Sequence, residues 1–258
     1  MRYFIEFAYN GTRFSGYQIQ LNGYTVQECV QNALGVLLKQ PTPIVGCGRT
    51  DAGVHAKQYF AHFDSEQELG EKMVYHLNAI LGKEVVIYNL HKVPPTAHAR
   101  FDASSRSYEY YVDVVYNPLR QESAYFCTYS QQLNIDLMQA AAKLLLDFQD
   151  FNTFCKTKSS AKTTLCDLRV SEWHYDAKEQ QLVYRVTANR FLRGMIRLIV
   201  GMCLNVGKGR IELETIRQAL EQKQPLQKAL SAPAQGLYLM DIEYPYIEPQ
   251  PILFDQLL

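Results

Sequence analysis

The chain has 258 residues, of which 47% are hydrophobic and 20% charged, so wholesale disorder is excluded and one large or two modest domains are expected. The 26 basic and 26 acidic residues give a net charge of zero, which excludes a uniformly basic nucleic-acid coat but permits a local basic patch. Six cysteines form neither a C-x-x-C pair nor a short Cys/His cluster, so a zinc site is not expected.

The N-terminus leads directly into M-R-Y-F-I-E-F, without a long apolar segment. No apolar run of about 18 residues occurs, which is the length that a membrane helix needs. Scattered cysteines in a chain of this length are typical of reduced thiols. We therefore expect no secretory signal, no membrane span and a cytoplasmic location.

The first half of the chain alternates between strand and helix signals. Thr25 and Glu28 form a capping box before a helical apolar stripe, and Ser65 with Glu68 repeats the box. The expected elements are strands over 2–9, 43–45, 57–64 and 85–90 and helices over 25–39 and 65–81. Their order is β-α-β-β-α-β, which is the ferredoxin-like split unit.

The second half repeats this order with one additional helix. The expected elements are strands over 105–115, 165–175, 181–188 and 237–244 and helices over 135–146, 191–206 and 212–222. We therefore predict an α+β protein built from two ferredoxin-like, RRM-like halves, whose antiparallel sheets flank a central catalytic cleft. Val93-Pro94-Pro95-Thr96 interrupts regular structure, so we expect an N-terminal domain over 1–103 and a C-terminal domain over 104–258.

The stretch from Gly46 to Ala56 reads G-C-G-R-T-D-A-G-V-H-A and lies between two expected strands. Its glycines indicate a tight connection that presents side chains at a sheet edge. Asp51 and Arg49 are the two side chains in it that could do chemistry. A turn capped by Asp51 is the alternative interpretation.

The string G-R-T-D-A-G-V-H-A resembles the catalytic loop of the TruA family of tRNA pseudouridine synthases. The resemblance implies an isomerase that converts uridine to pseudouridine on the 3′ side of the anticodon stem-loop, at tRNA positions 38–40. It implies that Asp51 is the nucleophile, which must stay ionised, so a cation is expected nearby. Arg49 would take the place of the extruded base, unless it is a surface arginine that bridges to phosphate.

The segment from Asn189 to Gly201 is similar to the family motif F-L-x-x-M-V-R-x-x-V-G. In the family this arginine contacts the catalytic aspartate, which implies that role for Arg197. An arginine in an apolar helix is costly unless it is paired, although a helix-surface position is the alternative. Phe191 heads the motif and is implied to pack against the target base, with a plain core position as its alternative.

The segment from Arg100 to Tyr110 is similar to the family pattern F-x-A-x-x-R-x-Y-x-Y. The first tyrosine of that pattern packs against the target uracil, and Tyr108 matches it. Tyr110 shares the face of Tyr108 on the expected strand, so one of the two could belong to the core. Arg100 and Arg106 are expected to contact phosphates.

Further matches run from Tyr9-Asn10-Gly11-Thr12 to the A-P-A-x-G-L-Y-L stretch that begins at Ala232, whereas Gln149-Asp150-Phe151 replaces the family H-D-F. Residues 156–210 hold 11 Lys and Arg against 4 Asp and Glu, which favours a surface for a polyanion. The resemblance implies a tRNA partner, a homodimer that holds one tRNA across both subunits, and no cofactor or metal.

Two other classes of function remain open from the sequence. A non-catalytic RNA-binding module or RNA chaperone would keep the fold and the basic segment without needing Asp51. A glycosidase would need two acidic residues about 5–10 Å apart across a cleft, and only one carboxylate stands in a motif here.

Overall fold

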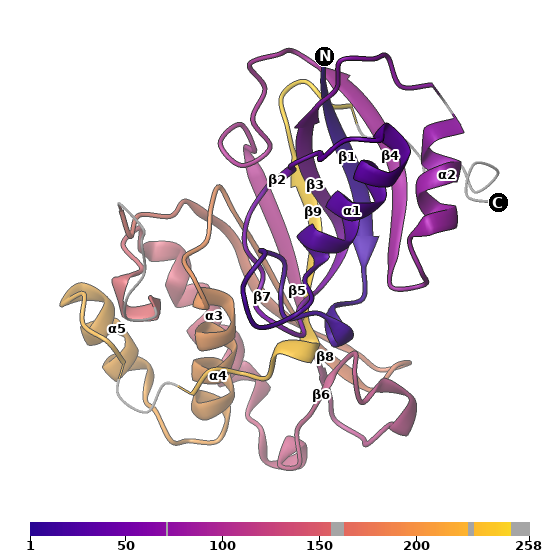
Figure 1. Ribbon diagram of the computed structural model, residues 1–258. Helices are drawn as coiled ribbons and strands as arrows, with labels where there is room; N and C mark the ends of the chain where they lie inside the picture. The colour runs from indigo at the N-terminus through magenta and orange to yellow at the C-terminus, as the bar shows by residue number, and fades with distance from the viewer. Residues whose placement is uncertain (71, 156–162, 227–229, 249–258) are drawn as a thin grey trace. The chain divides into compact units, whose positions relative to one another are not determined.

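The computed structural model describes residues 1–70, 72–155, 163–226 and 230–248 (Figure 1). The chain divides into two compact units. The first comprises Met1–Ser105 together with the chain from Leu239 onward, and the second comprises Arg106–Tyr238. We expected a C-terminal domain over 104–258, whereas the described residues after Tyr238 group with the first unit. Their contacts explain this, because Tyr244 donates a hydrogen bond to the Ala99 carbonyl and the Ile242 amide donates one to Gln58.

The first unit contains a sheet with two helices on one of its faces (Figure 1). Its elements are β1 (Arg2–Tyr9), α1 (Val26–Leu38), β2 (Val45–Gly46), β3 (His55–Asp64), α2 (Lys72–Ile80), β4 (Val85–Val93) and most of β9 (Leu237–Glu243). The strand order is β4-β1-β3-β9, and β2 pairs with one end of β3. The expected β-α-β-β-α-β order is confirmed.

Helix α1 forms where the sequence predicts it. The Thr25 hydroxyl accepts the Glu28 amide at 3.3 Å, which satisfies one of the unpaired donors at the helix start. Val26, Val30, Ala33 and Leu34 are buried along one face of the helix, and Lys39 ends it in the left-handed conformation. Local signals therefore suffice to define this helix.

The expected helix from Ser65 was wrong in its start, since α2 begins at Lys72. The Ser65 hydroxyl donates to the Gln67 carbonyl at 2.7 Å instead of capping a helix. Its backbone carbonyl accepts the Met1 ammonium at 2.6 Å, and its amide donates to the Met1 carbonyl. Pairing with the start of the chain therefore overrides the local capping signal.

The described residues of the second unit form three antiparallel strands, a short fourth strand and three α-helices (Figure 1). Its elements are β5 (Ser105–Asp113), β6 (Tyr125–Phe126), α3 (Ile135–Leu144), β7 (Leu168–Asp176), β8 (Gln181–Ala188), α4 (Met195–Gly207) and α5 (Leu213–Glu221). The strand order is β5-β8-β7. The short β6 departs from the antiparallel prediction because it pairs in parallel with β5. The α+β class is confirmed for the chain.

Helix α4 begins later than the sequence indicates. Gly194 precedes it with a φ of 72°, a left-handed conformation that favours glycine and starts the helix at Met195. Phe191 therefore lies in the segment that leads into α4 and not in its first turn. Helix α3 packs against both α4 and β7, so the buried face of α4 belongs to the core of this unit.

Candidate active site

The stretch that carries Asp51 connects β2 to β3 within the first unit. Val45 pairs with His62 and Gly46 with Ala61, and the Cys47 amide donates to the Phe60 carbonyl at 2.9 Å. The Tyr59 hydroxyl donates to the Gly48 carbonyl at 2.6 Å. Burial raises the pKa of Tyr59 well above its usual range, so this hydroxyl keeps its proton as a donor.

The N-terminal motif of the chain supports the same stretch from the other side. The Tyr9 hydroxyl lies 2.9 Å from the Thr50 hydroxyl, and the Tyr17 amide donates to the Thr50 carbonyl. Gly16 has a φ of 93°, and a Cβ there would lie 2.8 Å from the Thr50 carbonyl oxygen. The motif that begins at Tyr9 therefore holds the backbone beside Asp51 by close approach, which requires glycine.

His55 completes this support at the start of β3. It is 3% exposed, and its Nδ1 accepts the Gly11 amide at 3.1 Å. The Asp51 carbonyl accepts the Val54 amide at 3.2 Å, and Gly53 has a φ of 79°. The turn is thus closed by the main-chain carbonyl of Asp51. Both motifs are visible in the sequence, but the roles of Gly11, Gly16 and His55 are not, because nothing local shows that distant segments meet.

Asp51 and Arg49 are both presented by this supported stretch. The Asp51 residue is half-buried and Arg49 is exposed. A half-buried carboxylate on a fixed backbone has the placement that a nucleophile needs, since rigid support limits misplacement of the reacting atom. An exposed arginine beside it has the reach to contact a nucleic acid.

The second unit brings Tyr108 and Phe191 together. Tyr108 lies on β5 opposite Val186 of β8, and its ring meets that of Phe191 edge to face, with centroids 5.2 Å apart. Both residues are half-buried. Tyr110 is fully buried, and its hydroxyl donates to the Pro233 carbonyl at 2.8 Å. Tyr110 is therefore the core tyrosine, and the Tyr108–Phe191 pair offers aromatic edges suited to a flat base.

Arg197 lies in the first turn of α4 and is half-buried. Its Nε donates to the Ala232 carbonyl at 2.7 Å, and the Ala232 amide donates to the Arg197 carbonyl at 2.9 Å. A Cβ on Gly201 would lie 1.7 Å from the Leu230 carbonyl oxygen, so glycine permits this approach. The A-P-A stretch after Leu230 therefore fixes the direction of the Arg197 guanidinium.

The two arginines expected to contact phosphate differ in their surroundings. Arg106 donates from Nη1 to the Asn189 carbonyl at 2.8 Å, which ties β5 to the segment that holds Phe191. Arg100 is exposed in the first unit, and its guanidinium carbon lies 5.7 Å from the centre of the Phe101 ring. Lys156, Lys158 and Lys162 of the basic segment lie outside the described residues.

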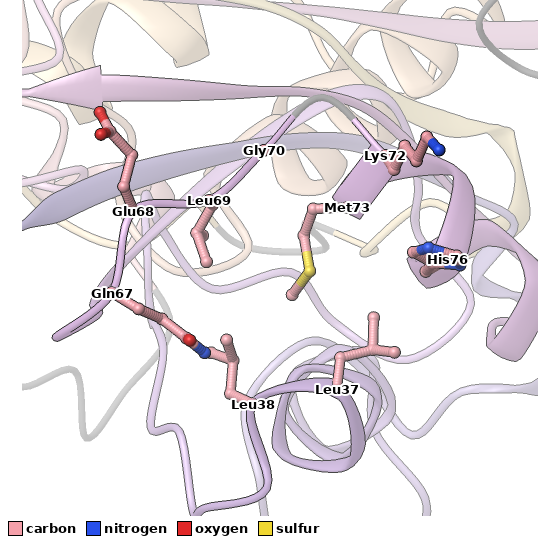
Figure 2. A pocket seen from close by; sticks show the side chains of 9 residues that line it. All are labelled: Leu37, Leu38, Gln67, Glu68, Leu69, Gly70, Lys72, Met73 and His76. Atoms are coloured by element: carbon pink, nitrogen blue, oxygen red, sulfur yellow. The ribbon is translucent and has the colours of Figure 1, made fainter.

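A shallow depression of about 250 Å³ lies in the first unit between α1 and the start of α2 (Figure 2). Figure 2 shows Leu37 and Leu38 of α1 facing Leu69 and Met73, with charged side chains at the rim. None of the predicted site residues lines it. Among the described residues, no three His, Cys, Asp or Glu side chains gather as a metal site would require, and no helix is long and apolar enough to cross a bilayer.

Comparisons with known proteins give a consistent result. A family model described as tRNA pseudouridine synthase matches residues 141–245. A protein named tRNA pseudouridine synthase A from Parabacteroides distasonis is 42% identical over 246 residues, which cover 95% of this chain and 96% of that protein. Proteins of the same name from Bacteroides fragilis and Limosilactobacillus reuteri are 40% and 36% identical, over 95% and 94% of this chain and 96% of each relative. The similarity therefore extends over both units.

Proposed function

The chain belongs to the tRNA pseudouridine synthase family, an isomerase family, and on this premise we propose that it converts uridine to pseudouridine at positions 38–40 of the tRNA anticodon stem-loop. In this reaction the N1–C1′ bond of uridine breaks, a C5–C1′ bond forms, the hydrogen at C5 leaves as a proton, and N1 takes up a proton. The isomerisation is redox-neutral, so it consumes no cofactor.

Asp51 is the proposed nucleophile, and the support of its backbone is the observation that carries the proposal. Thr50 is hydrogen-bonded to the Tyr9 hydroxyl and to the Tyr17 amide. Gly16 lies so close to the Thr50 carbonyl that a larger residue would not fit there. A carboxylate that adds transiently to the substrate divides one difficult bond exchange into two easier steps. A merely capping aspartate would not need such support from a separate segment of the chain.

The other residues have proposed roles that follow from their chemistry. Arg197 is the proposed cationic group of the catalytic site. Tyr108 and Phe191 pack against the uracil, and Arg49 occupies the space that the extruded nucleotide leaves in the stem.

Arg100 and Arg106 bind phosphates. The protein acts as a cytoplasmic homodimer that holds one tRNA across both subunits.

The experiment that tests this function is tritium release from tRNA labelled at C5 of uridine. Wild type should release tritium, whereas Asp51→Asn, which keeps the shape of the side chain and removes its charge, should release none above background. Asp147→Asn is the matched control, because Asp147 is exposed on the second unit. It should release tritium at the wild-type rate.

Two other outcomes of this experiment would contradict different parts of the proposal. Release by Asp51→Asn at the wild-type rate would leave a synthase with a different nucleophile. Absence of release by wild type, with tRNA still bound, would favour a non-catalytic RNA-binding module. That alternative keeps the basic segment but gives no reason for the support around Asp51.

A further inference from the structure

The loop that follows β4 is fixed to the first unit at several points. The Ala99 amide donates to Nδ1 of the buried His62 at 3.1 Å, and the Ala99 carbonyl accepts the Tyr244 hydroxyl. The Asp102 carboxylate accepts the His98 amide and the Tyr246 hydroxyl, each at 2.8 Å. Both β3 and the segment after β9 therefore hold this loop in one conformation.

The fixed loop presents an aromatic ring to solvent. Phe101 is 73% exposed, so it contributes little to the core. The His98 ring lies beside it with centroids 4.3 Å apart, and His98 Nδ1 accepts the Arg100 amide at 3.1 Å. The Arg100 guanidinium lies 5.7 Å from the Phe101 ring centre. The Phe101 ring thus has the His98 ring against it and the Arg100 guanidinium over it.

A phenylalanine that is 73% exposed gains little burial from the fold, so its rigid presentation is best explained by a ligand. A flat ring suits an unpaired nucleotide because every base can stack on it, and a neighbouring guanidinium suits the phosphate of the same nucleotide. The loop is ordered before binding, which reduces the entropy lost on association. A protein partner could use the same ring, but it would have no need of the adjacent cation.

We propose that Phe101 is a stacking platform for an unpaired base of the tRNA and that Arg100 binds a phosphate beside that base. This inference rests on the proposed function, since it takes tRNA as the substrate. It adds to the predicted site a contact with the substrate that lies outside the reacting uridine.

Equilibrium binding of a fluorescent, unmodified tRNA tests the proposal. Each variant is combined with Asp51→Asn, so that the RNA is not altered during the measurement. Base stacking contributes about 1–3 kcal/mol, so Phe101→Ala should weaken binding by about 5- to 150-fold. Phe101→Trp should bind within about twofold of the parent, and Phe101→Leu should remain weak because it keeps apolar area without a π face.

Tyr75→Ala is the matched control. Tyr75 is also an exposed aromatic residue beside a histidine, being 53% exposed with its ring 5.6 Å from that of His76. It lies on α2, and its loss should leave tRNA affinity unchanged. Unchanged affinity of Phe101→Ala would overturn the proposal, as would full affinity of Phe101→Leu.

The salt dependence of tRNA binding distinguishes the contribution of Arg100 from that of Phe101. Arg100→Gln should lower the slope of log affinity against log salt concentration by about 0.9, whereas Phe101→Ala should leave that slope unchanged. If the parent binds tRNA but Phe101→Ala only lowers the oligomeric state, the ring is a contact between copies of the chain and the proposal is wrong. If the parent binds no tRNA, the proposed function fails together with this inference.

Discussion

A hydrogen bond to the chain after α5 orients the Arg197 guanidinium. Its Nε is bonded to the Ala232 carbonyl at 2.7 Å, which fixes the plane of the group. A lysine at this position would keep the charge but could not reproduce that planar arrangement. Substitution of Arg197 can therefore separate the effect of its positive charge from the effect of its orientation.

We predict that Arg197→Met lowers kcat by about 100- to 1,000-fold, the usual cost of removing one positioned electrostatic group from an active site. The KM for tRNA should change little, because other residues provide most of the binding. Arg197→Lys should recover part of kcat. Single-turnover rates with tritiated tRNA measure this difference.

A purely structural role for Arg197 gives a different pattern. Both variants lose the planar guanidinium, so kcat would then fall only as far as the thermal midpoint falls in each variant. Equal loss in the lysine and methionine variants would therefore contradict the electrostatic role.

The roles of Tyr108 and Tyr110 could not be assigned from the sequence. Tyr108 and Tyr110 share a face of β5, and the sequence left open which of them belongs to the core. The structure separates them because Gly236 and Pro233 pack on Tyr110, whereas Phe191 meets Tyr108. Both sets of contacts come from segments more than 80 residues away, so no local pattern could assign them.

At the level of elements, local signals were sufficient where local contacts decide the structure. Thr25 caps α1 as its pattern indicates, but the similar pattern at Ser65 fails because the start of the chain pairs with it. The glycine-rich loop was predicted to be tight, yet its support by Gly11 and Gly16 depends on contacts across the fold. Motif resemblance, and not local pattern, is the basis for the proposed site residues.

The contact between β3 and the loop after β4 gives a pH dependence that can be measured. The pKa of His62 is lowered from 6.5 to about 4, mainly by burial and also by the nearby charges of Arg2 and His98, while Asp64 and Asp102 act in the opposite direction. Its Nδ1 accepts the Ala99 amide, which requires an unprotonated nitrogen. In the unfolded chain the same imidazole becomes protonated near pH 6.5.

The unfolded state therefore binds more protons than the folded state between about pH 6.5 and pH 4. We predict that the contribution of His62 to the free energy of unfolding is fully present above pH 6.5, and that the free energy of unfolding falls as the pH drops towards 4. His62→Asn keeps an acceptor for the Ala99 amide but does not titrate, so it should show a shallower fall. Urea unfolding at pH 7.5 and pH 5 measures both slopes.

Comparing the two slopes removes the contribution of the carboxylates, which titrate in both proteins. His76→Asn is the control, because His76 lies on α2 away from this contact. It should keep the wild-type slope. Parallel slopes for wild type and His62→Asn would show that His62 is not the group responsible.

For the whole chain, a net charge of zero means that attraction to RNA must come from the distribution of charge and not from its total. The basic residues of the second unit are not equivalent. Arg185 is bonded to Glu109 at 2.9 Å and Arg169 to Asp167 at 2.9 Å, so part of the positive charge is compensated locally. A count of charges along the sequence could not distinguish these arginines from uncompensated ones.

We predict that this difference appears in the salt dependence of tRNA binding. Arg193 is exposed just before α4, and Arg193→Gln should lower the slope of log affinity against log salt by about 0.9, because one phosphate contact and its released counterion are lost. Arg185→Gln should lower it by less, since Glu109 already competes for that guanidinium. Lys39→Gln at the end of α1 is the control and should leave the slope unchanged. If all three variants lower the slope equally, general charge and not a localised RNA-binding surface drives binding.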